Sequence, residues 1–184
     1  MSRYKLSKTL VMVGMMGAGK TAVGTALARL IGVPFLDSDS QIEQAANMSV
    51  GEIFETYGEA FFREKESLVL ARLLEGGPVV LSTGGGAFLQ KDNQNMIAEK
   101  GLAVWLKADR ELLWARVRHK STRPLLQVAN PKERLFELLD QREPVYQLAG
   151  EVVLADPNFS ISEMAQNVLD NLLARPDQIL TKVS

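Results

Sequence analysis

The stretch that most constrains the fold of this chain is residues 14–21, which reads Gly-Met-Met-Gly-Ala-Gly-Lys-Thr. It fits the pattern G-x-x-x-x-G-K-[ST] at every fixed position. An apolar run of strand length, residues 9–13, comes directly before it, and residues 22–31 carry apolar side chains at helical spacing. This order of strand, glycine-rich loop and helix is the one in which the pattern holds phosphate groups. The stretch therefore predicts a nucleotide-binding loop between a strand and a helix.

The residues of this loop have distinct physical roles. Glycine lets the backbone turn tightly and bring its N–H groups onto phosphate oxygens, and the helix that follows adds the positive end of its dipole. We expect Lys20 to reach the β- and γ-phosphates, and Thr21 to supply a hydroxyl to the Mg²⁺ that bridges them. A glycine-rich turn that only joins a strand to a helix is the alternative, and the complete match with its flanks disfavours it.

Length and composition favour one domain, 1–184. The 184 residues with 46% hydrophobic content suffice for one sizeable core. A net charge of -1 gives no basic field of the kind that attracts nucleic acid, so we expect no nucleic-acid partner. Cysteine is absent, residues 1–8 lack a signal-peptide core, and no apolar stretch is long enough to span a membrane. We expect a cytoplasmic protein without a membrane partner, and a monomer because no extended apolar surface is evident.

Strands alternate with helices along the chain, which predicts a parallel sheet covered on both faces. After residues 9–13, strands are expected at 35–36, 79–81, 102–106 and 151–154. Helices are expected at 41–46, from Ser49 as the cap through 57, at 60–74, 91–100, 110–118 with Asp109 as the cap, 131–142 and 160–173. In the helix at 60–74 we expect Phe61, Leu68, Ala71 and Leu74 to face inward. Residues 119–130 have no periodicity and suggest a loop that closes over a ligand. The tail from Arg175 is expected to be frayed.

Several side chains outside the loop suggest chemistry. Asp37 and Asp39 follow the second strand, and on an extended backbone they would point to opposite sides, one toward a metal ion and one toward a substrate. Arg63 or Arg142 could grip a substrate carboxylate with a two-pronged hydrogen bond. Taken singly, each has a plainer interpretation, as a turn residue or a solvated charge.

Absent motifs narrow the class of nucleotide-binding protein. No Asn-Lys-x-Asp guanine-binding sequence occurs, and the strand at 79–81 ends in Ser82 and Thr83 rather than in the acidic residue expected of a motor ATPase. These absences favour a small-molecule kinase, which needs an aligned acceptor, cations around the moving phosphoryl group and a closing element.

The set of motifs, taken in order, closely resembles the shikimate kinase family. The resemblance covers roughly residues 8–173 and rests on the phosphate loop followed by Asp37-Ser-Asp39, Phe62-Arg63-Glu64-Lys65-Glu66, Gly84-Gly85-Gly86, Arg123-Pro124-Leu125-Leu126 and Arg142-x-Pro144-x-Tyr146. It implies a three-layer α/β/α kinase fold with a five-stranded parallel sheet, a substrate-binding segment at about 37–66 and a mobile lid at about 116–130. The implied reaction moves the γ-phosphoryl group of MgATP to the 3-hydroxyl of shikimate, on the route to chorismate and the aromatic amino acids.

The resemblance also implies a role for each acceptor-site residue. Asp39 would hydrogen-bond ring hydroxyls and accept the departing proton, and Asp37 would hold Mg²⁺ through water alongside Thr21. Glu66 would orient Arg63. The groups that would contact shikimate are Asp39, Arg63, Gly85, Gly86, Arg142, Phe54 and Phe62.

On the nucleotide side, the resemblance implies that Arg116 lies over the adenine and that Arg123 reaches the transferred phosphate. Lys20, Asp39 and Arg123 would carry the chemistry. His119, the only histidine, would be an exposed lid residue. The residues that would contact ATP are Gly17, Ala18, Gly19, Lys20, Thr21, Ala22, Arg116 and Arg123.

Two alternatives stay open at this point. A gluconate kinase or a nucleoside-monophosphate kinase would share the architecture but use another acceptor. A nucleotide-switched binding module would bind ATP without turnover, but it leaves the paired aspartates and arginines without a purpose.

Overall fold

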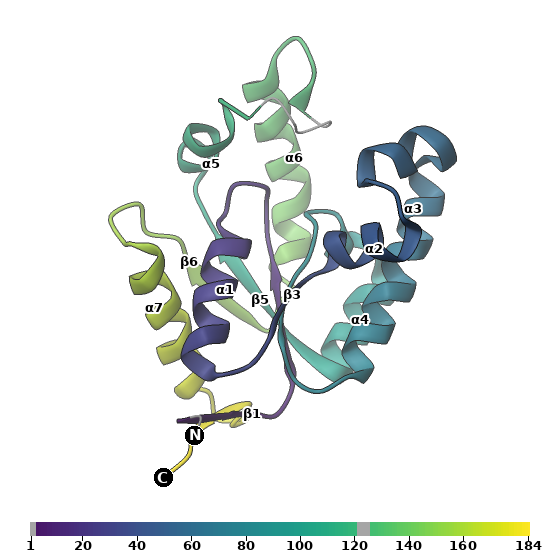
Figure 1. Cartoon of the computed structure of the whole chain (residues 1–184). Helices are drawn as coiled ribbons and strands as arrows, with labels where there is room; N and C mark the ends of the chain where they lie inside the picture. The colour runs from purple at the N-terminus through teal and green to yellow at the C-terminus, as the bar shows by residue number, and fades with distance from the viewer. Residues whose placement is uncertain (1–2, 121–125) are drawn as a thin grey trace.

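The computed structural model describes residues 3–120 and 126–184. Its main sheet is parallel and five-stranded, as the sequence predicts (Figure 1). The apolar runs of the two central strands are buried almost throughout, which is typical of a parallel sheet with helices on both faces. In spatial order the strands are β3 (Phe35–Asp37), β4 (Val80–Ser82), β2 (Thr9–Val13), β5 (Gly101–Lys107) and β6 (Glu151–Leu154).

Helices form the two outer layers. On one face α1 (Lys20–Ile31) packs beside α7 (Ile161–Leu173), and on the other α3 (Val50–Glu75) packs beside α4 (Lys91–Lys100). The remaining helices are α2 (Ser38–Ala46), the 3₁₀ turn η1 (Ala87–Leu89), α5 (Arg110–Val117) and α6 (Pro131–Tyr146). No helix within 3–120 or 126–184 is long and apolar enough to cross a membrane.

Side-chain caps begin the helices where the sequence predicts them. Asp109 accepts a hydrogen bond from the Leu112 N–H at 2.8 Å, and Ser49 and Ser160 each form a capping box. The two helices expected on either side of residue 58 meet at Gly58, whose φ of 84° interrupts α3.

Two local predictions were wrong. The backbone is not extended through Asp39: Asp37 accepts a hydrogen bond from the Ser40 N–H at 3.0 Å, so α2 already begins at Ser38. Leu68 is exposed by 57%, because the buried face of α3 at this point carries Val69, which packs against Ile42 of α2, and Leu70, which packs in the main core.

The prediction that the chain is frayed from Arg175 onward was also wrong. Strand β7 (Leu180–Lys182) pairs antiparallel with β1 (Tyr4–Leu6), and Leu180 is 2% exposed. Arg175 donates hydrogen bonds to Glu151 at 2.8 Å and to Asp177, which holds the C-terminal segment against β6. The two ends of the chain therefore form a small second sheet below the main one (Figure 1).

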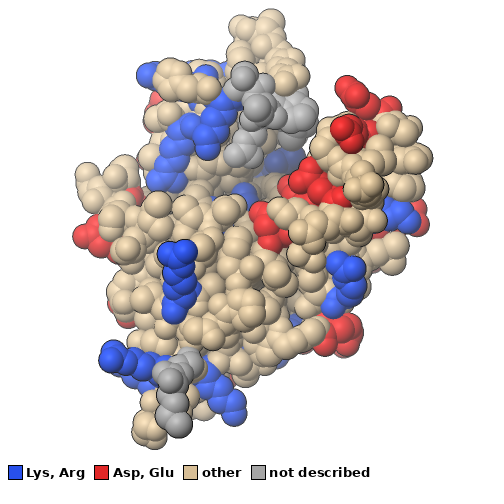
Figure 2. Space-filling model, in the orientation of Figure 1, with Lys and Arg blue, Asp and Glu red and all other residues tan. Residues whose placement is uncertain are grey.

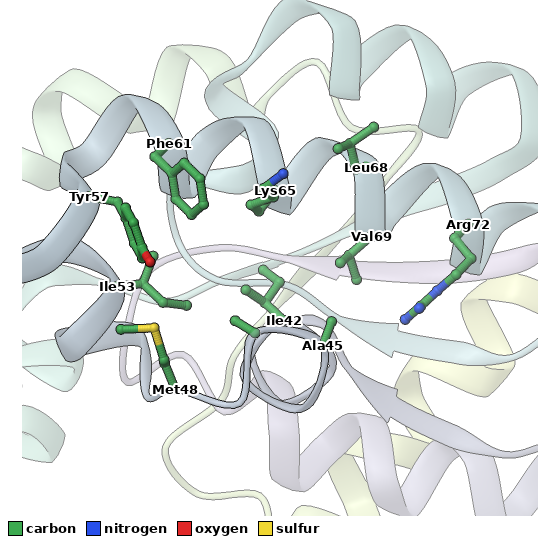
Figure 3. A pocket seen from close by; sticks show the side chains of 11 residues that line it. Ile42, Ala45, Met48, Ile53, Tyr57, Phe61, Lys65, Leu68, Val69 and Arg72 are labelled. Atoms are coloured by element: carbon green, nitrogen blue, oxygen red, sulfur yellow. The ribbon is translucent and has the colours of Figure 1, made fainter.

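Helices α2 and α3 enclose a small core of their own. Ile42, Ile53, Phe62 and Val69 form a buried cluster separate from the main core. A pocket of about 440 Å³ opens beside this cluster, with α2 on one side and α3 on the other (Figure 3). None of the predicted site residues lines this pocket.

Candidate active site

The phosphate loop follows β2 and leads into α1. Gly17 has a φ of 82°, and a Cβ there would lie 2.7 Å from a methyl carbon of Val117. Both the backbone conformation and the close contact therefore favour glycine at this position. Gly19 has a φ of 96° and caps α1 without a side chain, which leaves the first N–H groups of the helix open toward the loop. The Lys20 ammonium donates to the carbonyls of Gly14 at 2.6 Å and Met15 at 2.9 Å. The loop thus holds its cation next to its own N–H groups.

Other predicted ATP contacts lie around this loop. The Arg116 guanidinium, from the last turn of α5, donates to the Gly17 carbonyl at 3.0 Å. Thr21 and Ala22 are exposed on the first turn of α1, while Ala18 is buried. Arg123 lies outside the described residues.

The two aspartates lie where β3 turns into α2. Burial raises the pKa of Asp39, as does the charge of Asp37, while the charges of Lys20 and Arg63 lower it. The Oδ1 atom of Asp39 is buried and has no hydrogen-bond partner among the described residues. A buried, unpaired carboxylate oxygen is costly, and it is suited to a substrate hydroxyl that would hydrogen-bond to it.

Arg63 reaches this point from α3 and is held by Glu66. Its Nη1 donates to both carboxylate oxygens of Glu66, at 3.0 and 3.2 Å. Glu66 is 1% exposed; burial raises its pKa and the charge of Arg63 opposes that increase. The guanidinium carbon lies 5.2 Å from the centre of the Phe62 ring, and the Phe62 and Phe54 rings are 4.7 Å apart.

The triple glycine lies between the two arginines. A Cβ on Gly86 would come within 2.4 Å of Nη2 of Arg63, and a Cβ on Gly85 within 2.9 Å of Nη1 of Arg142. A Cβ on Gly84 would lie 3.1 Å from Oδ1 of Asp39. Any side chain on Gly85 or Gly86 would displace an arginine, so glycine at these positions keeps both guanidinium groups where they are.

Arg142 is an unusual buried cation. It is 7% exposed, and its Nη1 has no hydrogen-bond partner within the part of the chain that the structure describes. A buried guanidinium with an unpartnered N–H donor calls for an anion, and a carboxylate matches its fork of donors. Figure 2 shows the surface hollowed between basic side chains near α5 and acidic side chains over α2 and α3.

One residue of the site received no role from the sequence. Tyr146, the last residue of α6, is fully buried and donates a hydrogen bond to the Gly85 carbonyl at 2.5 Å. It stands one helical turn after Arg142, and that spacing is the signal that could have linked the two.

The donor set fits a magnesium ion that is shared with a nucleotide. Among the described residues, no three Asp, Glu, His or Cys side chains could hold a metal together. Mg²⁺ is usually held by one or two carboxylates plus phosphate oxygens and water rather than by a full protein cage. Asp37 at the end of β3 and Thr21 in the first turn of α1 match that pattern. Asp39 lies close enough to Asp37 and Lys20 for their charges to shift its pKa.

Comparisons with known proteins agree with this geometry. A family model described as "Shikimate kinase" matches residues 16–173. A shikimate kinase of Ruegeria pomeroyi is 61% identical over 172 residues, covering 94% of this chain and 88% of that protein. One of Cereibacter sphaeroides is 59% identical over 177 residues, covering 96% and 88%.

A solved structure gives the same family from the fold. Shikimate kinase from Acinetobacter baumannii in complex with shikimate superposes with a TM-score of 0.85 at 39% identity, covering 91% of this chain and 93% of that one. With a family model over most of the chain and close relatives over nearly all of it, this chain belongs to the shikimate kinase family.

Proposed function

We propose that this chain is an ATP-dependent shikimate kinase that converts shikimate and ATP into 3-phosphoshikimate and ADP. The observation that carries the proposal is the convergence of Arg63 and Arg142 on Gly86 and Gly85, with Asp39 beside Gly84. Two guanidinium groups and one unpartnered carboxylate oxygen match an acceptor that carries both a carboxylate and hydroxyls.

On the acceptor side, Arg63 and Arg142 bind the shikimate carboxylate, and the N–H groups of Gly85 and Gly86 approach the substrate. Phe54 and Phe62 support the Arg63 side of the site, and Glu66 keeps Arg63 in place. Asp39 accepts a hydrogen bond from the 3-hydroxyl. Its raised pKa makes it a stronger base than an ordinary aspartate.

In the transfer step, the 3-hydroxyl oxygen forms a bond to the γ-phosphorus while the bond from that phosphorus to the bridging oxygen of ADP breaks. The hydroxyl proton passes to Asp39. Lys20 exchanges the Gly14 and Met15 carbonyls for phosphate oxygens, and so follows the negative charge of the moving group.

On the nucleotide side, the N–H groups of residues 17–22 hold the phosphates and Arg116 lies over the adenine. Arg123 completes the cation set in this proposal. Thr21 and Asp37 would hold Mg²⁺, Asp37 through water, and the ion would neutralise charge on the phosphate oxygens.

The division of labour along the chain is part of the same proposal. One domain, 1–184, contains an acceptor-binding segment at about 37–66 and a lid at about 116–130. The separate core beneath α2 and α3 supports treating the acceptor segment as a unit. From the sequence we also propose a monomer in the cytoplasm.

The test is ADP release with a panel of acceptors: shikimate, gluconate and AMP, each against an ATP-only background. We expect turnover with shikimate alone, and a product whose phosphorus resonance couples to the proton on C3. ADP release with gluconate or AMP at a higher kcat/KM would assign a different kinase. ATP binding with no acceptor-dependent turnover would point to a nucleotide-switched module.

A further inference from the structure

Tyr146 makes the shortest hydrogen bond to the triple glycine. Its hydroxyl lies 2.5 Å from the Gly85 carbonyl oxygen, and its side chain is 0% exposed. Its ring packs against Trp105 on β5, with ring centres 5.8 Å apart. The Tyr146 ring therefore contacts the sheet through Trp105, and its hydroxyl points toward the glycine backbone.

The hydroxyl must be protonated to make this bond. Burial raises the pKa of Tyr146, while the charge of Arg142 one turn earlier opposes the increase. The phenol keeps its proton at neutral pH, and that single proton is used by the Gly85 carbonyl.

This bond fixes more than a carbonyl. The C=O of Gly85 and the N–H of Gly86 belong to one planar trans peptide, in which the two groups point in opposite directions. Holding the carbonyl toward Tyr146 therefore turns the Gly86 N–H away from it. No backbone acceptor in the described residues takes the N–H of Gly85 or of Gly86.

Two adjacent glycines would otherwise leave this peptide poorly constrained, because glycine has the widest backbone freedom. A stiffer residue at either position would push the Arg63 or Arg142 guanidinium out of place, since its Cβ would meet that group. The Tyr146 hydroxyl supplies the constraint that side chains cannot supply here.

Arg142 belongs to the same cluster. It lies one turn before Tyr146 on α6, and its Nη1 is 2.9 Å from where a Gly85 Cβ would be. On the basis of the proposed function, we propose that Tyr146 is a positioning residue, whose hydroxyl orients the Gly85–Gly86 peptide and the adjoining Arg142 for the carboxylate of shikimate. Tyr146 itself does not touch the reacting atoms.

The test is Tyr146→Phe, which removes the hydroxyl and keeps the ring against Trp105. We expect the shikimate KM, and the shikimate Kd by calorimetry without ATP, to rise about tenfold, because a buried donor and its acceptor are parted. The ATP KM should change less than twofold, and kcat should fall less than the shikimate KM rises. Tyr4→Phe is the matched control, because Tyr4 lies on β1, at the end of the molecule away from the phosphate loop (Figure 1), and the change should leave all constants unchanged.

The results of this test separate a positioning role of Tyr146 from a purely structural role. A lower Tm with an unchanged shikimate KM would mean that Tyr146 only stabilises the fold, and equal losses for shikimate and ATP would also overturn the proposal. Absence of shikimate turnover in the unsubstituted chain would instead refute the proposed function. As a measurement that does not depend on the variant folding, the fluorine resonance of Tyr146 in 3-fluorotyrosine-labelled protein should move on adding shikimate; a resonance that stays in place overturns the proposal.

Discussion

The ionised side chain of Asp39 destabilises the folded state. Its pKa is raised above the usual value of 3.8, so the folded state binds its proton more tightly than the unfolded state does. The sign follows: as pH rises from about 3.8 through the raised pKa, ionisation of Asp39 makes folding less favourable. Above the raised pKa the full penalty is present, and the proposed reaction requires it because only the ionised form can accept a proton.

Asp39→Asn should therefore slow turnover and stabilise the fold. We expect shikimate-dependent ADP release to fall at least about a hundredfold, as for loss of a general base. The Tm of the variant should exceed that of the unsubstituted chain at pH 8, and the difference should shrink toward pH 4. Scanning calorimetry at the two pH values measures this, and a lower Tm of the variant at pH 8 would contradict the raised pKa.

Loss of the Arg63 side chain should affect both the binding of the acceptor and the stability of the fold. Removing it takes one cation from the acceptor site and leaves Glu66, which is 1% exposed, without its ion-pair partner. Arg63→Ala should lower kcat/KM for shikimate by at least about thirtyfold, equivalent to roughly 2 kcal/mol or more, with little change in the ATP Kd. It should also lower the free energy of unfolding by up to about 3 kcal/mol, because a buried carboxylate is left unpaired.

A double variant separates these two effects. Arg63→Ala with Glu66→Gln removes the stranded charge, so it should recover much of the stability measured by urea unfolding and none of the shikimate binding. If the double variant also recovered shikimate binding, Arg63 would serve the fold and not the acceptor. Equal losses for ATP and shikimate in Arg63→Ala would remove the clamp from the proposed function.

Among the elements, the β1–β7 sheet is the one that the sequence interpretation missed. Leu180 is 2% exposed, and its strand lies at the end of the molecule away from the phosphate loop (Figure 1). Leu180→Ala should cost about 2 kcal/mol, which corresponds to a Tm lower by about 4–8 °C in a chain of this size. The shikimate and ATP KM values should not change.

Val183→Ala is the control for that change, because Val183 is 52% exposed on the same segment. Its Tm should stay within about 1 °C of the original. A similar loss for both variants would mean that the tail contributes through chain length or pairing and not through burial of Leu180.

The difference between predicted and missed elements lies in the range of the interactions that form them. The helix of residues 91–100 and the cap at Asp109 depend on neighbours within a few positions, and the structure has them as predicted. Strand β7 has three residues and pairs with β1 across almost the whole chain, so no local pattern marks it. The helical start at Ser38 was missed because the backbone was expected to stay extended through Asp39, although Asp37, the last residue of β3, is also a preferred helix cap.

The sequence could predict which residues cluster at the candidate site, but it could not predict how their atoms are arranged. The resemblance to the family implied that Asp39, Arg63 and Arg142 share one site, and the structure brings all three to the triple glycine. The hydrogen bond of Tyr146 to a backbone carbonyl depends on how α6 docks beside η1, and side-chain identity alone does not carry that information.

At the scale of the whole molecule, the acceptor residues and the loop are supported by different cores. The phosphate loop continues from β2 in the main cluster, whereas the residues around Asp39 and Arg63 lie over the small cluster of Ile42, Ile53, Phe62 and Val69. A small core with an adjoining pocket gives few buried contacts, so α2 and α3 should open locally at a lower free energy than the central strands (Figure 3).

Hydrogen exchange tests this arrangement. Shikimate alone should slow exchange in residues 37–66, because in the proposed function it bridges Arg63 and Asp39 to the triple glycine on the main body. ADP alone should slow exchange chiefly in residues 14–22. Amides of β2 and β5 should exchange only on global unfolding and serve as the internal reference. If shikimate slowed exchange equally in residues 37–66 and in β7, binding would be stabilising the chain as one cooperative body. That result would contradict the inference that the acceptor segment opens as a separate unit.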